Sequence, residues 1–488
     1  MKFARFLVLW LALFGLCIAA RLPYLLSDRL FIDIDEATIG IMAKDLLKGK
    51  PLAYYFYLQN YGFSTIETIV TALFIKICGP GVWALKLGGL FLYSLGSSFL
   101  VRYLIDKQTG RLLVFCSIII IVAFPPWFMW GMLMRGGYIT AFACAMAVFY
   151  ITQAKQNSYV LVSVSALLFY IGYESNAVIF LPVFPLLIYW LWSHKFVLWK
   201  WMTFFLVFIV PLVLGRILFV DKQLGDIQMD FSFHQVSMSL ISFTGFWHHA
   251  FTNFYFYNSV FTIPMYWKVL SLVLVLLFLY IIATGSISRE NRIRWLLVLS
   301  GTVASLIIAG TALSFSIRYS QGLFTGVLIL IIISIASSRG KVIKYLLPLM
   351  ALITFTGTST GSKIGSHWIQ TSANELHEMD ELYHRVKERH ISALYSTDRT
   401  SVWDYLYGDD IPSSHVCGFD RSVQFSIRLN KLKAKNKKIG LFGNTGYQSE
   451  LKNNPGERDT FLIAERYFLI ENINDTLLMQ IQEKVCAH

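Results

Sequence analysis

The chain has 488 residues, of which 56% are hydrophobic, 16% are aromatic and only 15% are charged. A soluble domain of this size could not bury so much apolar surface in one core, so the composition indicates a polytopic membrane protein. The formal net charge of +13 does not indicate a nucleic-acid partner, because apolar blocks long enough to span a bilayer separate the basic residues.

The first apolar stretch has features of a signal peptide and of a membrane span. Lys2 and Arg5 precede it and small residues stand near its end, as in a signal peptide. However, "RLPYLL" prolongs the apolar run past Ala20, and no clean small-x-small site precedes Arg21. We therefore expect this segment to be retained as the first span.

Apolar runs flanked by Lys and Arg predict about eleven spans, with the N-terminus in the cytoplasm. Four short loops between the spans carry clusters of basic residues, and all four fall on the side of the N-terminus, as the positive-inside rule requires. The odd number of spans then places the C-terminal segment outside. The predicted spans are 6–26, 82–104, 112–131, 138–154, 158–174, 177–193, 201–220, 267–286, 295–313, 322–337 and 342–358.

The first outer loop, at about 28–81, contains two helical stretches that are too short to cross the bilayer. In "DEATIGIMAKDLLKGK" and "STIETIVTALFIKICG" the apolar residues recur at helical spacing. We expect two amphipathic helices in the outer interface, with apolar faces against acyl chains and polar faces in water.

Three acids, Asp33, Asp35 and Glu36, stand at the start of the first of these helices. One interpretation is helix capping, in which the carboxylates accept backbone N–H groups and favour the helix dipole. Capping alone does not explain three carboxylates in four positions at a water–lipid boundary, where repulsion and desolvation are costly. Such a cluster also suits a general base, or a cation site at Asp33 and Asp35.

Four cations on the predicted outer side stand apart from the cytoplasmic basic clusters: Lys86, Arg135, Arg216 and Arg318. Each alone could snorkel to the interface or pair with a lipid phosphate. Facing one acid cluster, they suit a substrate that is half lipid and half water-soluble with a phosphate between, such as a polyprenyl-phosphate sugar. A carboxylate would deprotonate an acceptor hydroxyl that attacks the anomeric carbon, while Arg or Lys stabilises the departing lipid phosphate.

The second outer loop and the C-terminal segment have different compositions. The loop, at about 221–266, is rich in aromatic residues and contains His248 and His249, which are candidates for acceptor binding or for interfacial packing. From Thr371 the composition becomes soluble, with a predicted helix in "SANELHEMDELYHRVKERH" and short strands in "ISALYS", "KKIGLFG", "DTFLIAE" and "RYFLIE". We expect a small α/β domain, in which the spacing of Cys417 and Cys486 allows a disulfide but does not require one.

This pattern resembles the GT-C glycosyltransferases, specifically the protein O-mannosyltransferase and lipid A aminoarabinose transferase group and its bacterial relatives. That family carries an acidic pair, often Asp-Glu, soon after the first span, and Asp35-Glu36 match it. The resemblance covers about residues 1–340. Further matching stretches are "FIKICGPGVWALKLGG", with Lys86 where Arg is usual, "RGGYIT" from Arg135 to Thr140, and the pair Arg318-Tyr319.

The resemblance implies an all-α GT-C membrane domain, which we expect at 1–360, and the soluble composition after it predicts a periplasmic α/β domain at 361–488. It also implies an inverting sugar transfer with catalytic residues Asp35 and Glu36. The family's second interfacial helix often starts His-Pro-Pro-Leu, whereas this chain has "YGFSTIE", so that Glu67 is either an acceptor contact or a solvent-facing acid. No cofactor is required, although Asp33 and Asp35 leave Mg²⁺ or Mn²⁺ open. The implied donor-phosphate residues are Lys86, Arg135, Arg216, Arg318 and Tyr319.

We therefore expect a multi-pass glycosyltransferase of the bacterial inner membrane that uses undecaprenyl phosphate as the sugar carrier. An O-antigen or other lipopolysaccharide glycan, a teichoic-type polymer and a protein stay open as acceptors. A surface glycan is favoured because an outer domain is well placed to hold a polymer. No residue indicates which sugar is transferred. Glucose is suggested only by analogy with prophage-type enzymes that modify surface glycans.

Two other functions fit parts of the pattern. A transporter or flippase of lipid-linked sugars would also need many spans and phosphate-binding cations, but transporters usually place ionisable residues near the midplane of the bilayer. Here those residues stand at the predicted outer helix ends. A receptor whose outer domain binds a ligand would have no use for the acids of the first loop.

Overall fold

The computed structural model describes residues 2–28, 30–57, 62–154, 158–193, 198–219, 289–312, 321–337, 341–364, 374–418, 423–444, 460–463, 467–471 and 475–486, with a few single positions between these ranges. The chain divides into two compact units. Unit 1 contains Met1–Leu25, Asn60–Glu67 and Lys86–Gln370, and unit 2 contains Leu26–Gln59, Thr68–Leu85 and Thr371–His488. Unit 2 thus groups much of the first outer loop with the C-terminal domain, a grouping that the sequence does not indicate.

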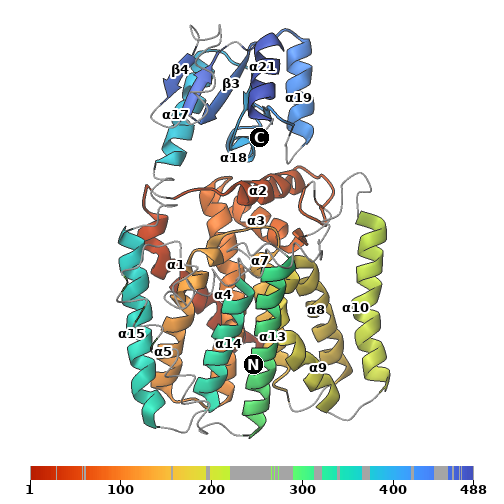
Figure 1. Ribbon diagram of the computed structural model, residues 1–488, viewed down its shortest axis with the longest axis vertical. Coiled ribbons are helices and arrows are strands. Elements are labelled where there is room, and N and C mark those ends of the chain that lie inside the picture. The colour runs from red at the N-terminus through yellow and green to blue at the C-terminus, as the bar shows by residue number, and fades with distance from the viewer. Residues whose placement is uncertain are drawn as a thin grey trace. The chain divides into compact units, whose positions relative to one another are not determined.

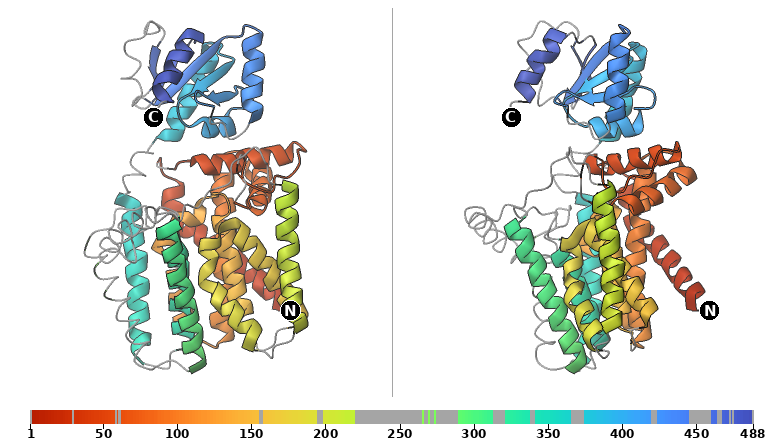
Figure 2. Two further views of the ribbon diagram at one scale, coloured as in Figure 1. Left: turned by 45° about the vertical axis from the view of Figure 1, so that its right-hand side comes forward. Right: turned by 90° about the vertical axis from the view of Figure 1, so that its right-hand side faces the viewer.

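Unit 1 is a bundle of mostly apolar helices that stand side by side, with α1 inclined to the others (Figures 1 and 2). Within the bundle α7 packs on α8, α10 on α8, α13 on α14, and α15 on α5. The helices are α1 (Lys2–Leu25), α4 (Val82–Asp106), α5 (Arg111–Val122), α6 (Pro125–Phe128), η1 (Trp130–Met132), α7 (Tyr138–Ile151), α8 (Tyr159–Phe180), η2 (Leu181–Val183), α9 (Phe184–Ser193), α10 (Leu198–Phe219), α13 (Arg289–Ala312), α14 (Gln321–Ser337) and α15 (Lys341–Ile364).

Several of these helices can span a bilayer. By length and composition, five helical segments of the described chain qualify, and the bent pair Arg111–Val122 and Pro125–Met132, with an angle of 57°, makes a sixth. Three further apolar helices are shorter, at Tyr138–Ile151, Gln321–Ser337 and Tyr345–Thr358. These segments fall where the sequence predicts spans. The span predicted at 267–286 lies outside the described residues.

The segment from α8 to α9 is a helical hairpin, as its two predicted spans require. Asn176, near the C-terminal end of α8, has extended backbone angles, φ −163° and ψ 97°. The rings of Phe169 and Phe184 lie 5.4 Å apart, whereas one straight helix would separate these residues by about 22 Å. The chain therefore reverses at Asn176, and the turn carries Glu174.

Unit 2 contains the two helices of the first loop and an α/β domain. The loop helices are α2 (Ile34–Leu47) and α3 (Thr65–Cys78), of which the residues from Thr68 onward belong to unit 2. The domain has the helices α17 (Glu375–Glu388), α18 (Thr400–Leu406), α19 (Val423–Ala434) and α21 (Asp475–Val485). Its strands are β1 (Ala393–Ser396), β2 (Ser413–His415), β3 (Ile439–Asn444), β4 (Thr460–Ile463) and β5 (Tyr467–Ile470).

The α/β domain is built on a five-stranded mixed sheet in the order β2-β1-β3-β5-β4. Strand β1 runs parallel to β2 and β3, and β5 runs antiparallel to β3 and β4. On one face, Leu429 of α19 and Ile481 of α21 share a core with the strands. On the other face, Trp403 of α18 lies 5.2 Å from Phe442 of β3, ring centre to ring centre. A disulfide joins Cys417 to Cys486.

The two loop helices differ in how they use their faces. In α3 the side chains of Ile69, Leu73 and Ile77 are exposed on one stripe while Thr68 and Thr71 are buried, as expected for an apolar face turned to acyl chains. In α2 the expectation was wrong. Residues 36–43 and the acid Asp45 are buried, because protein groups rather than water and lipid surround this helix.

Candidate functional site

The first turn of α2 is organised by a capping box made of two of the predicted acids. The Asp33 carboxylate accepts a hydrogen bond from the Asp35 N–H at 3.0 Å, and Glu36 Oε2 accepts one from the Asp33 N–H at 3.0 Å. Asp33 and Glu36 are both buried. The capping interpretation therefore holds for these two acids, which satisfy N–H groups that the helix itself leaves open.

Asp35 is the acid of the cluster that the capping box does not engage through its side chain. It contributes its backbone N–H to the box, and its residue surface is partly exposed while that of Glu36 is fully buried. A partly exposed acid in the first turn of a helix can be reached by a substrate hydroxyl. This geometry makes Asp35 the better candidate for a general base.

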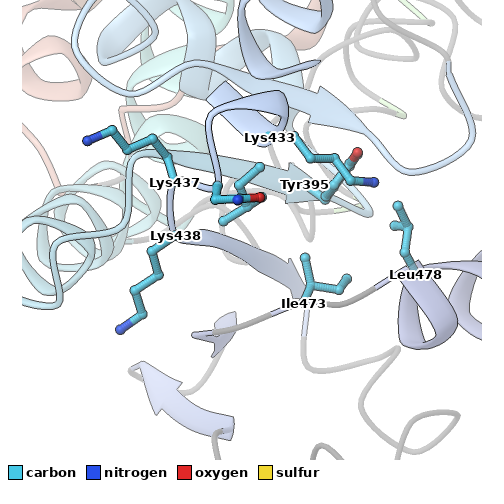
Figure 3. Close-up of a pocket in the computed structure, with 8 residues that line it drawn as sticks. Tyr395, Lys433, Lys437, Lys438, Ile473 and Leu478 are labelled. Atoms are coloured by element: carbon cyan, nitrogen blue, oxygen red, sulfur yellow. The ribbon is translucent and has the colours of Figure 1, made fainter. Parts of the chain in front are cut away.

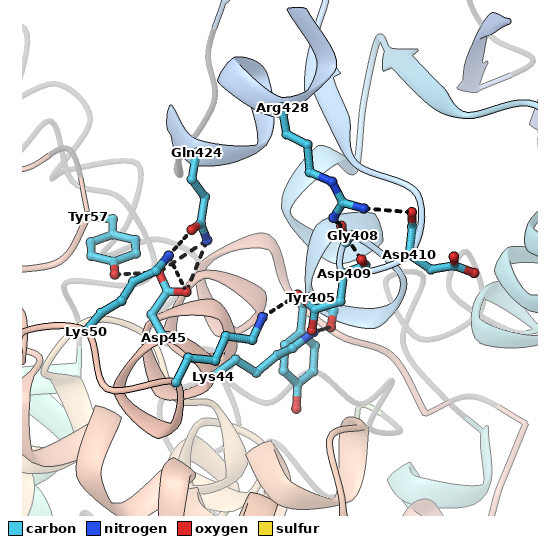
Figure 4. A network of polar contacts seen from close by, with 11 residues as sticks. Lys44, Asp45, Lys50, Tyr57, Tyr405, Gly408, Asp409, Asp410, Gln424 and Arg428 are labelled. Atoms are coloured by element: carbon cyan, nitrogen blue, oxygen red, sulfur yellow. Dashed lines mark hydrogen bonds and ion pairs between the residues drawn. The ribbon is translucent and has the colours of Figure 1, made fainter. Parts of the chain in front are cut away.

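The polar face of α2 is held by a network within unit 2 (Figure 4). Asp45 is buried and accepts hydrogen bonds from Lys50 Nζ and Tyr57 Oη at 2.9 Å each, and from Gln424 Nε2 of α19 at 3.1 Å. Burial, the largest cause, and the Asp45 carboxylate both raise the pKa of Tyr57. The network ties the C-terminal half of α2 to a residue that lies 379 positions later in the chain.

A second set of contacts joins α2 to α18 and the residues after it. Lys44 Nζ lies 2.9 Å from the Asp409 carboxylate and donates to the Tyr405 carbonyl at 2.8 Å, and Lys48 pairs with the same carboxylate. Partial burial works against ionisation of Asp409, but hydrogen bonds from Lys48 and Lys44 keep its pKa below the usual value. Gly40 allows α2 to lie close to the Tyr405 ring, because a Cβ at this position would be only 2.4 Å from the ring.

Glu67, in the first turn of α3, contacts the start of α7 and does not face solvent. Its side chain is fully buried, and Thr140 Oγ1 donates to Glu67 Oε1 at 3.4 Å. Burial raises the pKa of Glu67 to about 7, although hydrogen bonds from the backbone of Gly137, Thr140 and Ile139 lower it. The solvent-facing alternative for Glu67 is therefore wrong, whereas acceptor binding stays a prediction.

The loop that carries Arg135 is fixed by two glycines in left-handed conformations. Gly136 and Gly137 have φ of 60° and 99°, and a Cβ on Gly137 would lie 2.6 Å from the Ser175 carbonyl oxygen. Ser175 in turn donates from its hydroxyl to the Phe63 carbonyl at 3.4 Å. Arg135 is half-buried, with its guanidinium 5.0 Å from the centre of the Trp130 ring. The "RGGYIT" stretch is thus a tightly packed turn that presents one arginine.

Two other predicted cations lie in unit 1, and one of them, Arg216, is linked to this turn. Arg216 pairs with Glu174 at 3.3 Å, and Glu174 lies beside the Ser175 that Gly137 contacts. Lys86 is fully buried in the first turn of α4, where an ammonium group is costly unless anions or polar groups surround it. Unit 1 therefore brings together the segments of Glu67, Arg135 and Arg216.

Other predicted residues are not located by the structure. Arg318, Tyr319, His248 and His249 lie outside the described residues. Across the described part of the chain, no group of three or more His, Cys, Asp and Glu side chains is arranged to hold a metal ion. The cation site at Asp33 and Asp35 stays a prediction.

Two buried charged residues, Arg21 and Asp45, were not predicted from the sequence to have a structural role, but each makes several hydrogen bonds between distant segments. Arg21 donates to the Phe128 carbonyl at 2.7 Å and to the Val122 carbonyl at 3.2 Å, so that it satisfies carbonyls at the C-terminal ends of α6 and α5. Asp45 holds the network described above. A lone Arg at the end of an apolar run was the available signal for Arg21, but no local pattern marks Asp45, whose amide partner lies in α19.

Comparison with known proteins identifies the fold. No model of a protein family matches the sequence, and no curated protein does. Among solved structures, ArnT from Cupriavidus metallidurans in the apo state matches with a TM-score of 0.59 and 11% identity, over 97% of this chain and 99% of that one. The same protein bound to undecaprenyl phosphate matches with a TM-score of 0.59 and 11% identity, over 96% and 98%. The chain therefore has the fold of these ArnT structures.

Proposed function

We propose that this chain is an inverting glycosyltransferase that moves a sugar, with glucose as the first one to test, from a polyprenyl-phosphate donor to a periplasmic surface glycan. One observation carries the proposal: nearly the whole chain shares its fold with an ArnT structure that holds undecaprenyl phosphate. The partly exposed carboxylate of Asp35, in the first turn of α2, supplies the chemistry that such a donor needs.

In the proposed reaction, Asp35 accepts the proton of an acceptor hydroxyl as the oxygen attacks the anomeric carbon. The bond between that carbon and the phosphate oxygen breaks on the opposite side, which inverts the anomeric centre and releases the lipid phosphate. Lys86, Arg135 and Arg216, together with Arg318 and Tyr319, are assigned to the phosphate, because cations stabilise the charge that develops there. His248, His249 and Glu67 stay candidates for acceptor contacts.

Glu36 receives a different role from the one the family resemblance implies. Its carboxylate is buried and accepts the Asp33 N–H, so we assign it to positioning the first turn rather than to proton transfer. Asp33 has the same task from the other end of the capping box.

The proposed location is the bacterial inner membrane, with the N-terminus in the cytoplasm and the α/β domain in the periplasm. The four basic loops support this orientation. The disulfide between Cys417 and Cys486 also supports it, because disulfides persist in oxidising compartments such as the periplasm and are rare in the cytosol.

The test is sugar transfer by the purified chain in lipid, with undecaprenyl-phosphate glucose and lipopolysaccharide glycan. Asp35→Asn should lower kcat by about a hundredfold or more, as expected for loss of a general base. Glu36→Gln is the matched control, because its amide oxygen can still accept the Asp33 N–H, and it should retain more activity than Asp35→Asn. Transfer by Asp35→Asn at the wild-type rate would refute the assignment of the base, and no donor consumption by the wild type would refute the function.

A further inference from the structure

Tyr405 of α18 contacts two segments of the first outer loop at once, and all three segments belong to unit 2. Its side chain is fully buried, and its ring lies against α2 at Gly40. Its hydroxyl accepts a hydrogen bond from the Gly81 N–H at 3.0 Å and donates one to the Gly81 carbonyl at 2.9 Å. Lys44 of α2 donates to the Tyr405 carbonyl at 2.8 Å, and its ammonium lies 5.7 Å from the ring centre (Figure 4). One residue of the α/β domain therefore joins α2 to the residue that precedes α4.

Both glycines that Tyr405 contacts are explained by this arrangement. Gly40 stands in the interior of a helix, where glycine is less favourable than alanine because it loses more backbone freedom. The close approach of the Tyr405 ring requires it there. Gly81 precedes the first turn of α4, and its carbonyl also accepts the Ala84 N–H at 3.2 Å. Gly81 has no side chain for hydrogen bonding, and the Tyr405 hydroxyl, 324 positions later in the chain, bonds both of its backbone groups.

The Tyr405 hydroxyl is held in its neutral form, in which it can both donate and accept a hydrogen bond. Burial, the largest cause, raises the pKa of Tyr405, and although a hydrogen bond with the Gly81 backbone lowers it, the nearby Cys78 and Glu36 groups raise it further. Glu36 belongs to the capping box of α2. The hydroxyl therefore lies near the helix turn that carries Asp35.

The cavity of the α/β domain lies apart from Tyr405. This cavity, of about 470 Å³, is lined by residues of β1, β3, α19, α21 and the turns beside them, and none of the described residues that line it belongs to α18 (Figure 3). Helices α19 and α21 pack on one face of the sheet, whereas Trp403 of α18 packs on the other. A change at Tyr405 therefore tests the contact with the first loop and leaves the cavity unaltered.

Each contact of Tyr405 lies close to a residue assigned to the proposed reaction. Gly40 follows Asp35 by five positions in α2, and Lys86 follows Gly81 by five positions in the segment that forms α4. Five residues of helix correspond to a rise of about 7.5 Å. A shift of α2 against the start of α4 would therefore move the proposed base, and a misplacement of about 1 Å can lower a rate by about a hundredfold.

We propose that Tyr405 is a positioning residue for sugar transfer, which holds Asp35 in place by fixing α2 to the start of α4. The inference rests on the proposed function, because it takes Asp35 as the general base. It adds a residue of the α/β domain to the reaction. Tyr405 acts through α2 and does not touch the donor or the acceptor.

The experiment compares Tyr405→Phe with Tyr407→Phe in the full chain in lipid, with undecaprenyl-phosphate glucose and lipopolysaccharide glycan as substrates. Tyr405→Phe removes the hydroxyl and leaves the ring against Gly40. Tyr407→Phe is the matched control, because its hydroxyl bonds Asp380 of α17 inside the α/β domain. We expect Tyr405→Phe to lower kcat about tenfold with the KM for the glycan changed less than about twofold, and Tyr407→Phe to keep kcat within about twofold.

Two further measurements separate positioning from a general loss of stability. In an Asp35→Asn background, Tyr405→Phe should change the residual kcat by less than about twofold, because the effects of residues that act as a unit do not add. Hydrogen exchange of residues 79–85 should be about tenfold faster in Tyr405→Phe and unchanged in Tyr407→Phe, because only the first variant removes the partner of the Gly81 N–H.

The role of Tyr405 is overturned if Tyr405→Phe transfers sugar at the wild-type rate, or if Tyr407→Phe slows transfer as much. A tenfold loss that persists in the Asp35→Asn background also overturns it, because the hydroxyl would then act independently of the base. A raised KM for the glycan with kcat unchanged would instead indicate a contact with the acceptor. If the wild type transfers sugar and only these results are contrary, the proposed function stands without Tyr405. If the wild type consumes no donor, the proposed function fails, and faster exchange in Tyr405→Phe would leave Tyr405 a structural link alone.

Discussion

Removal of the Asp45 carboxylate by Asp45→Ala should destabilise the contact between α2 and the α/β domain. The carboxylate is almost fully buried and accepts hydrogen bonds from Lys50, Tyr57 and Gln424. A hydrogen bond to a charged group contributes about 1.5–3 kcal/mol. Because the Lys50 side chain is 41% exposed and can return to water, we count mainly the other two bonds. The two bonds together contribute at least about 3 kcal/mol, and the better helix propensity of alanine returns about 0.5 kcal/mol. The expected net loss of stability is therefore roughly 3 kcal/mol.

Asp409→Ala is the matched control for this prediction. Its side chain is 46% exposed and also pairs with lysines of α2, but exposed ion pairs contribute only about 0–1 kcal/mol. Hydrogen exchange of the α2 amides in the full chain measures the local free energy of opening, and thermal unfolding in detergent measures the overall effect. Asp45→Ala should speed exchange in α2 by about a hundredfold, against less than about fivefold for Asp409→Ala. Equal effects would show that burial of Asp45 does not govern the contact.

Two further predictions concern unit 1. The pKa of Glu67 is raised from 4.5 to about 7, so the folded state binds the proton more tightly than the unfolded state, and stability from this group is lost as the pH rises from 4.5 to 7. The Tm of the wild type should therefore fall relative to that of Glu67→Gln across this window, and parallel Tm profiles would contradict the raised pKa. Gly137→Ala should destabilise the fold in two ways, because alanine disfavours the positive φ and its Cβ would clash with the Ser175 carbonyl. Gly49→Ala is the control, because Gly49 has φ 80° with open space around it, so that only the backbone conformation costs stability, by about 1 kcal/mol. Thermal unfolding should show a clearly larger loss for Gly137→Ala, and equal losses would mean that the turn relaxes.

The sequence predicted the helices of this fold better than the sheet of the C-terminal domain. Apolar runs and their basic flanks mark the spans because a bilayer requires about 20 apolar residues per helix. In the α/β domain, β1, β3, β4 and β5 were predicted from their β-branched and aromatic residues. Strand β2, with the residues Ser413–His415, was missed because a short polar strand is recognisable only from its pairing with β1.

For the candidate site, the sequence indicates local features such as helix capping, but it does not indicate contacts between residues that are far apart in the chain. The order Asp33, Asp35, Glu36 before an apolar run predicts helix capping, and the structure shows it in the form of a capping box. The sequence could not say which of the three carboxylates would be engaged in it. It also predicted a solvated polar face for α2, because the partners of Asp45 and Lys44 in the C-terminal domain follow more than 350 residues later. Tertiary burial of this kind overrides the amphipathic pattern of a short helix.

The restraints on α2 bear directly on the proposed chemistry. The capping box fixes its first turn, and the Asp45 and Lys44 contacts fix its other end to the α/β domain. Asp35 therefore stands on a helix that is held at both ends, and a general base is effective only when its geometry is set before the substrate arrives. We therefore expect the C-terminal domain to support the proposed reaction by holding α2 in place. Loss of its contacts with α2 should lower the rate of the proposed sugar transfer without altering any group that is assigned to the donor.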